Sequence, residues 1–118
     1  RGKLKVERVD CVVDCGLAVN PDSVRSQMEG SIIMGMSATL FEQVTLEDGR
    51  VVQSNFDDYR IARMRDTPEI NVTIVQSDAP PTGTGKSNSP VAPAITNAIF
   101  AARGVRIRRL PIGRQKLV

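Results

Sequence analysis

Residues 12–43, VVDCGLAVNPDSVRSQMEGSIIMGMSATLFEQ, contain the helix around which the rest of the chain is expected to be organised. Asn20 offers an N-cap side chain, Pro21 suits the first helical position, and Asp22 places a negative charge in the first turn. From Ile32 to Phe41 the helix is apolar or small nearly all round. Such a helix is covered on most sides. In a chain of only 118 residues, that pattern also predicts self-association into a dimer or larger oligomer.

Two glycines interrupt this helix. Gly30 and Gly35 each lower helix propensity by about 1 kcal/mol relative to alanine. We therefore expect another backbone, or a ligand, to approach the helix closely at these positions.

Strand patterns lie on both sides of the helix. Residues 3–15 and 69–77 alternate apolar and polar side chains, which is typical of half-buried strands. Asp48-Gly49 separates two short apolar runs and predicts a hairpin. The segment VRIRRLPI at 105–112 is expected to be extended.

A second helix is predicted after the loop at 79–89. Ser89-Pro90 begins it, Pro93 falls within its first turn, and Gly104 ends it. The resulting order of elements favours an α+β fold, with a small mixed sheet and two helices on one face. Residues 1–118 are expected to form a single domain with a basic C-terminal tail at 105–118.

The composition excludes several classes of protein. Aromatic residues make up only 3% of the chain, too few for a protein that binds nucleic acid by stacking. No run of 18 apolar residues predicts a membrane span. Residues 103–118 hold six of the 16 basic groups and no acidic group, which leaves 10 basic and 13 acidic groups elsewhere. A solvated basic end is the simpler interpretation; binding to nucleic acid or a membrane surface is the alternative.

The chain has no histidine and two cysteines, Cys11 and Cys15. The absence of histidine removes a Ser-His or Cys-His triad from this chain. Two thiolates alone are too few for a closed zinc site. In a strand, residues four apart lie about 13 Å apart, too far for a disulfide. Buried free thiols are therefore expected.

The loop PPTGTGKSNSP at 80–90 contains a glycine turn followed by Lys86. A phosphate-binding loop needs four residues between its glycines, whereas Gly83 and Gly85 are one residue apart. The dinucleotide-binding pattern also fails, because Asn88 stands where its third glycine would be. Taken alone, the loop predicts a connection, or an anion site at the start of the second helix.

Three longer stretches change this interpretation: residues 12–43, 55–72 and 77–112. They contain D-C-G-x-x-x-N-P, Q-x-E-G, and P-x-A-P-A-I-x-N-A-I followed by L-P-I. In order and spacing they resemble the C-terminal end of the molybdenum hydroxylase large subunit, in the xanthine dehydrogenase and aldehyde oxidase family. The bacterial isoquinoline 1-oxidoreductase and nicotinate dehydrogenase type is the most similar. That subunit is several times longer than 118 residues, and the chain begins without methionine, so we expect a section of it.

The resemblance implies a cofactor, partners and a reaction. The family's large subunit binds molybdopterin and hydroxylates N-heterocycles or aldehydes with oxygen from water. A subunit or domain with [2Fe-2S] clusters removes the electrons. Gln27 matches the glutamine that hydrogen-bonds the pterin, and Gly83 and Gly85 match glycines that bring the backbone close to the metal ligands. No residue of this chain is implied as a metal ligand, and none of the cofactor is expected in the chain alone.

Lys86 departs from the family pattern. The family carries a glutamate there, which acts as the base during hydroxylation, and it is usually followed by proline rather than Ser87. A lysine is protonated at neutral pH and has no lone pair to accept a proton. The substitution leaves three alternatives open: a degenerate paralogue, a different chemistry, or an anion-binding role.

Two hypotheses of different class follow. The first is the C-terminal piece of a molybdenum-dependent oxidoreductase, inactive in isolation and altered at the base position. The second is a free-standing, non-catalytic remnant that binds a partner protein or an anionic ligand. The compartment stays open between bacterial cytoplasm and periplasm.

Overall fold

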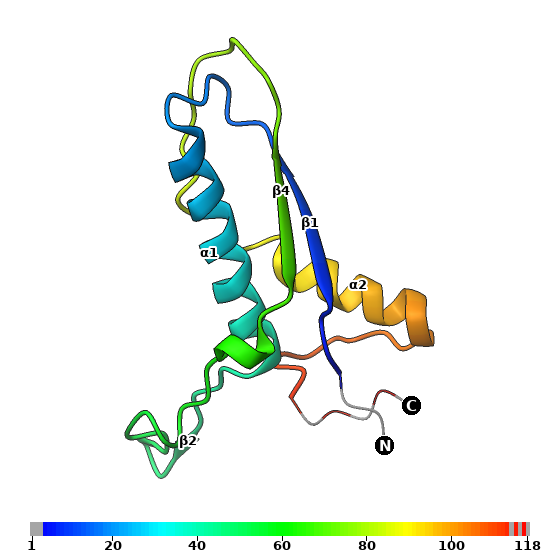
Figure 1. The fold of residues 1–118 in the computed structure, drawn as a ribbon. Coiled ribbons are helices and arrows are strands. Elements are labelled where there is room, and N and C mark those ends of the chain that lie inside the picture. Colours follow the sequence, from blue (N-terminus) through cyan, green and yellow to red (C-terminus); the bar gives the residue numbers. More distant parts are fainter. Residues whose placement is uncertain (1–3, 114, 116, 118) are drawn as a thin grey trace.

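The structure is a computed structural model that describes residues 4–113, 115 and 117. Figure 1 shows two helices and a small amount of strand, which confirms the α+β class. In chain order the elements are β1 (Arg8–Val13), α1 (Pro21–Leu40), β2 (Leu46–Glu47), β3 (Arg50–Val51), the 3₁₀ turn η1 (Met64–Asp66), β4 (Glu69–Ile74) and α2 (Val91–Arg103).

The strands form two small sheets instead of one mixed sheet. β1 and β4 pair in parallel, from Arg8 opposite Glu69 to Val13 opposite Ile74. β2 and β3 form a separate antiparallel hairpin that projects from the body of the molecule (Figure 1). Its turn is the predicted Asp48-Gly49 pair, with φ values of 49° and 75°, as a two-residue hairpin turn requires.

Both helices cover the same face of the parallel sheet, as predicted. Val9 and Cys11 of β1 and Ile70 of β4 pack against a cluster of buried residues from the helices. The alternate residues of β1, among them Asp10 and Val12, are exposed on the opposite face. The core comprises Ile32, Met36, Leu40, Val91, Ile95, Ile99 and Ile112.

The predicted start of α1 and the predicted end of α2 are confirmed, whereas α2 begins at Val91 instead of Pro90 and has no side-chain cap. The Asn20 side chain accepts a hydrogen bond from the Ser23 N–H at 3.1 Å, and Pro21 is the first residue of α1. Gly104 follows α2 with a φ of 71°, and its N–H donates to the Phe100 carbonyl at 2.7 Å. A left-handed residue at this position is a common helix end.

The segment from Ile32 to Phe41 is covered on fewer sides than its composition predicts. Ile32, Met36 and Leu40 are buried in the core, whereas Met34 is 63% exposed and Ala38 is also exposed. The chain therefore covers most of this segment by itself, and the physical reason for self-association is weaker than the sequence indicates.

The segment at 105–112, which is expected to be extended, joins neither sheet. This segment returns beneath α2 to the end of α1 (Figure 1) and forms no strand. The N–H of Ile112 donates to the Thr39 carbonyl at 2.8 Å, and that of Gly113 donates to the Leu40 carbonyl at 3.0 Å. The segment thereby satisfies carbonyls that the last turn of a helix leaves free, and it buries Ile112 completely.

Candidate functional site

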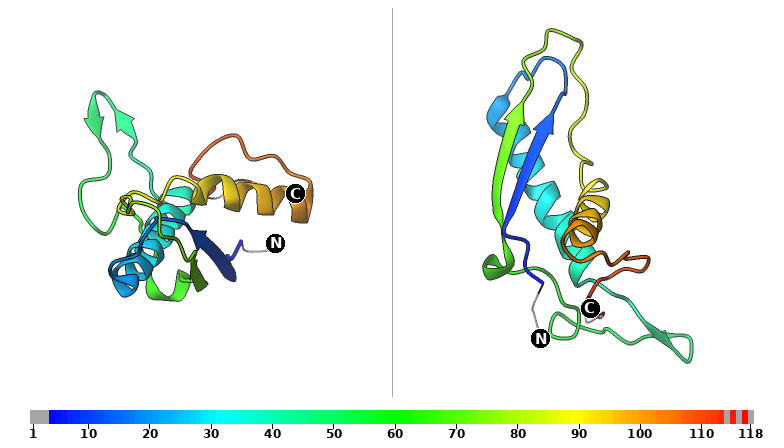
Figure 2. Two further views of the ribbon diagram at one scale, coloured as in Figure 1. Left: turned by 90° about the horizontal axis from the view of Figure 1, so that it is seen from above. Right: turned by 90° about the vertical axis from the view of Figure 1, so that its right-hand side faces the viewer.

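The loop that carries Lys86 is anchored at its start by the loop that follows β1. The N–H of Leu17 donates to the Ala79 carbonyl at 2.8 Å, and the N–H of Thr82 donates to the Cys15 carbonyl at 2.8 Å. These bonds hold the two loops side by side beyond the carboxyl ends of the parallel strands (Figures 1 and 2).

Gly16 makes this approach possible. Its φ is 69°, a left-handed conformation that favours glycine. A Cβ at this position would lie 2.7 Å from the Ala79 carbonyl oxygen and closer still to that of Pro80. Asp14 supports the turn, because its Oδ1 accepts a hydrogen bond from the Gly16 N–H at 3.1 Å. This role explains the D-C-G motif, and sequence reasoning missed it although the glycine directly follows a strand pattern.

The far end of the loop is anchored on α1 at Gly35. A Cβ on Gly35 would lie 2.7 Å from the Asn88 carbonyl oxygen and 2.8 Å from the Val91 Cβ. The predicted close approach at this glycine is confirmed. At Gly30, by contrast, no atom of the described chain lies within 4 Å of such a Cβ.

Between these two anchors, Gly83, Gly85 and Lys86 lie exposed on the loop. The Ser87 hydroxyl donates to the Thr84 carbonyl at 3.1 Å and closes a turn around Gly85 and Lys86. Neither glycine has a positive φ, and nothing in the described chain comes within 4 Å of a Cβ built on either. The described chain itself therefore gives no steric reason for glycine at these two positions.

Gln27 lies on an exposed part of α1, the helix beside which the loop runs. Eight residues separate it from Gly35, which places the two side-chain directions about 80° apart around the helix. Among the described residues, no hydrogen bond joins the Gln27 side chain to the loop or to any other group. The structure thus brings Gly83, Gly85 and Lys86 together and leaves the Gln27 amide free on the neighbouring helix.

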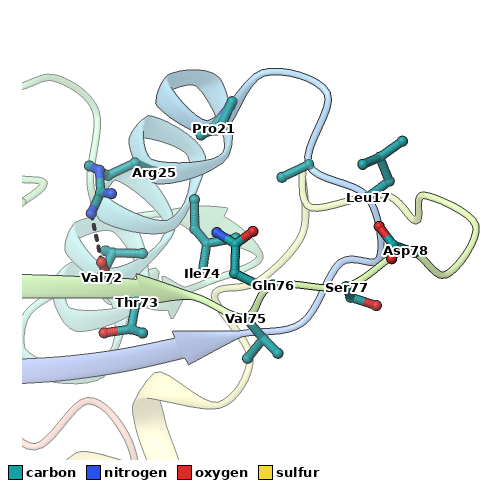
Figure 3. Close-up of a pocket in the computed structure, with 11 residues that line it drawn as sticks. Leu17, Pro21, Arg25, Val72, Thr73, Ile74, Val75, Gln76, Ser77 and Asp78 are labelled. Atoms are coloured by element: carbon teal, nitrogen blue, oxygen red, sulfur yellow. Dashed lines mark hydrogen bonds between the residues drawn. The ribbon is translucent and has the colours of Figure 1, made fainter.

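A groove of about 420 Å³ lies between the start of α1 and residues 72–78, next to the clamped loops (Figure 3). The start of α1, with Pro21 and Arg25, forms one wall, and residues 72–78 form the other. The Arg25 Nη1 donates to the Val72 carbonyl at 2.6 Å across the groove. The groove contains none of the site residues predicted from the sequence, and the long-range pairing that forms it has no local signal.

The two cysteines are free thiols, as predicted. Cys15 is buried, and Cys11 is half-buried on the covered face of the sheet, where burial raises the pKa of its thiol. Across residues 4–113, 115 and 117, the structure shows no group of three or more Cys, Asp and Glu side chains that could hold a metal ion. Within the same range, no helix is long and apolar enough to cross a membrane.

Comparison with known proteins identifies the class to which this fold and loop belong. Residues 1–68 match the family of molybdopterin cofactor-binding domains. The chain therefore belongs to that family, and the resemblance predicted from its motifs is confirmed.

Three known proteins are similar to this chain over most of its length. It is 41% identical to the isoquinoline 1-oxidoreductase subunit beta of Brevundimonas diminuta, over 92% of this chain and 14% of that protein. It is 38% identical to the membrane-bound aldehyde dehydrogenase (pyrroloquinoline-quinone) of Gluconacetobacter polyoxogenes, over 94% of this chain and 14% of that protein. The crystal structure of quinoline 2-oxidoreductase from Pseudomonas putida 86 superposes with a TM-score of 0.79 at 30% identity, over 92% of this chain and 15% of that one. The chain thus spans about one-seventh of the length of these relatives.

Proposed function

We propose that this chain is the C-terminal section of a molybdenum-dependent oxidoreductase subunit that hydroxylates N-heterocycles or aldehydes with oxygen from water. Membership of the molybdopterin-binding family supports this proposal. The named substrates of its relatives, an isoquinoline and a quinoline on one side and an aldehyde on the other, support the substrate classes. The remainder of the subunit and a [2Fe-2S] subunit or domain are its proposed partners.

The observation that carries the proposal is the open loop at Gly83 and Gly85. Glycine destabilises a loop through its larger conformational freedom in the unfolded state, yet neither residue needs that freedom here, because both have ordinary φ values and open space around them. A group from outside the chain that contacts the loop backbone accounts for both glycines. Backbone N–H groups in such a loop suit the anionic parts of a molybdopterin cofactor.

The exposed amide of Gln27 fits the same group. An amide offers two donors and an acceptor, which matches the mixed donors and acceptors on the edge of a pterin. When bound, the cofactor supplies the metal centre at which the substrate is oxidised. Within this chain, Gln27 would orient the pterin edge, and Gly83 and Gly85 would allow the loop backbone to approach it.

Lys86 would have a different effect from the family's glutamate. Its ammonium group is exposed in the turn closed by Ser87, and it offers donors but no acceptor. It would therefore not replace the glutamate in the role that the resemblance implies for that residue. We propose that the side chain contributes positive charge beside an anionic cofactor and leaves standard hydroxylation impaired. The same cation supports the second hypothesis, a non-catalytic protein that binds an anionic ligand.

The test uses the complete protein that contains these residues. Molybdenum content is measured for the wild type and for Gly83→Val and Gly85→Val. Both variants should keep the wild-type melting temperature, since a Cβ built on either glycine meets no atom of the described chain within 4 Å. Both should lose at least about tenfold in molybdenum content, because the added side chain blocks the approach of the cofactor to the loop backbone. Ala101→Val, at an exposed position of α2, is the matched control. A wild type without molybdenum, or two valine variants that retain it, would contradict the proposal.

Self-association stays a prediction for the chain alone. Met34 and Ala38 leave an exposed strip on α1, which either a second copy or the remainder of the subunit could cover. Light scattering at micromolar concentration separates a monomer from an oligomer.

A further inference from the structure

The outer edge of β1 is open to a further strand. In a parallel ladder, the N–H and C=O groups of one residue point toward the same neighbouring strand, and successive residues alternate between the two sides. The N–H of Glu69 donates to the Glu7 carbonyl at 3.0 Å, so the odd-numbered residues of β1 face β4. The backbone groups of Arg8, Asp10 and Val12 therefore point away from β4. Among the described residues, no hydrogen bond reaches these groups.

The outer edge of β4 differs, because a side chain already occupies it. By the same alternation, the backbone groups of Val72 point away from β1. The Val72 carbonyl accepts a hydrogen bond of 2.6 Å from Arg25 (Figure 3). A charged side chain on a sheet edge opposes the addition of another strand. Of the two edges, the one on β1 is therefore free for pairing.

Helix α2 extends beyond this free edge. Figure 1 and the left panel of Figure 2 both show α2 crossing behind the strands and continuing past β1. Val91 and Ile95 are buried on the face of α2 that meets the core. Ala102 follows them by 11 and seven residues, which places it on the same stripe, yet it is exposed. The face of α2 that covers the sheet thus continues past the sheet, where Ala102 of its last turn is exposed.

We propose that the outer edge of β1 pairs with a strand from another part of the same, longer subunit, and that alternate apolar side chains of this strand pack under α2. A two-stranded sheet is marginal by itself, and most sheets have about four to six strands. The proposed occupant is the same polypeptide because the chain spans only 14% of the length of its relatives. This inference rests on the proposed function only in taking the chain as a section of a longer subunit.

Hydrogen–deuterium exchange of the complete subunit, resolved to single amides, tests this pairing. The amides of Arg8, Asp10 and Val12 should exchange at least about 100-fold more slowly than unstructured amides. Those of Val9 and Cys11 face β4 and serve as internal controls for a folded sheet. Slow exchange at the controls together with fast exchange at the outward amides overturns the proposal. Protection that disappears on dilution assigns the edge to a second copy and overturns the proposed occupant.

A proline variant tests the edge independently. Val12→Pro removes an outward N–H without removing a bond to β4, and Val12→Ala is the matched control that shortens the side chain but keeps the N–H. In the complete subunit, Val12→Pro should speed exchange at Arg8 and Asp10 at least about tenfold, whereas Val12→Ala should leave it unchanged. Equal exchange in both variants contradicts the pairing. A subunit that lacks molybdenum but shows slow exchange at the outward amides of β1 would contradict the proposed function and leave this inference intact.

Discussion

Gly35 of α1 and Asn88 of the loop before α2 lie so close that a methyl group on Gly35 would come within 2.7 Å of the Asn88 carbonyl oxygen. This contact fixes the crossing point of the two helices and the end of the loop that carries Lys86. It also distinguishes Gly35 from Gly30, which look equivalent in the sequence.

Gly35→Ala should destabilise the chain, and Gly30→Ala should stabilise it. Alanine at position 35 meets the Asn88 carbonyl and the Val91 side chain, and overpacking of this kind costs about 1–3 kcal/mol. Alanine at position 30 meets nothing within 4 Å in the described chain and gains about 0.5–1 kcal/mol of helix propensity. Urea denaturation of both variants measures the difference. Equal shifts of the two midpoints would show that the helices do not cross at Gly35.

Gly16→Ala should release the loop at 79–82. The new side chain would be strained by the φ of 69° and would meet the carbonyls of Ala79 and Pro80. Strain of this kind alone costs about 1–3 kcal/mol. Amide exchange at Leu17 and Thr82, the two donors of the loop clamp, should become faster. Gly30→Ala provides the control for an added methyl group; unchanged exchange at both donors would disprove the clamp.

Arg25→Met should loosen the attachment of α1 to β4. The variant keeps the long side-chain stem but loses the donor to the Val72 carbonyl. Because the Arg25 side chain is exposed, we expect a loss below the range usual for a charged hydrogen bond and typical of a neutral one, about 1 kcal/mol. Arg25→Lys, which keeps the charge, should recover part of it. A methionine variant as stable as the wild type would indicate that the bond contributes nothing.

The turn at residues 54–58 should lose stability in acid. The Asp58 carboxylate accepts hydrogen bonds from the N–H groups of Ser54 and Asn55, and these bonds lower the pKa of Asp58, with Ser54 as the largest cause. Since the folded pKa lies below the unfolded value of about 3.9, the contribution is complete above that value and is lost as the pH falls through the folded pKa.

Amide NMR signals of Ser54 and Asn55 followed from pH 7 downward measure this effect. They should titrate below a pH of about 4 in the wild type and show no such step in Asp58→Asn. A step at or above the ordinary aspartate value in the wild type would contradict the assignment.

Lys86→Glu should raise turnover in the complete, cofactor-loaded subunit. A carboxylate at this position restores a proton acceptor, and general-base steps contribute about 10²–10⁴-fold. We expect at least a tenfold gain, about 1.4 kcal/mol, on a panel of N-heterocycles and aldehydes, with both proteins matched for molybdenum content. Lys86→Gln controls for loss of the positive charge. A fast wild type and a slower glutamate variant would show that Lys86 is a working part of another mechanism.

Local signals predicted the parts of the fold that depend on neighbouring residues. The cap at Asn20, the turn at Asp48-Gly49 and the end of α2 at Gly104 each require a backbone conformation that a few residues determine. The course of residues 105–112 was not predicted, because the Ile112 N–H bonds to the Thr39 carbonyl of α1, some 70 residues earlier in the chain. The clamp at Gly16 was missed for the same reason, since its partner lies in the loop after β4.

In the candidate site, too, sequence patterns identified residues but not the long-range contacts that position them. The glycines, Lys86 and Gln27 were found through the family pattern. The position of the loop beside α1 comes from Gly16 and Gly35, whose partners no local pattern reveals. The roles of Gln27, Gly83, Gly85 and Lys86 stay predictions, because the group that they would contact is not a part of this chain.

The parallel pairing of β1 with β4 has a consequence for how the protein is made. Paired residues are 61 positions apart, as in Arg8 and Glu69. At about 5–20 residues per second, a ribosome releases β1 roughly 3–12 s before β4. During that interval β1 carries apolar residues and unpaired backbone groups on both edges, and such high-contact-order pairing is slow even when both strands are present. Chaperone dependence during synthesis should therefore increase when translation is slowed between the codons of β1 and those of β4.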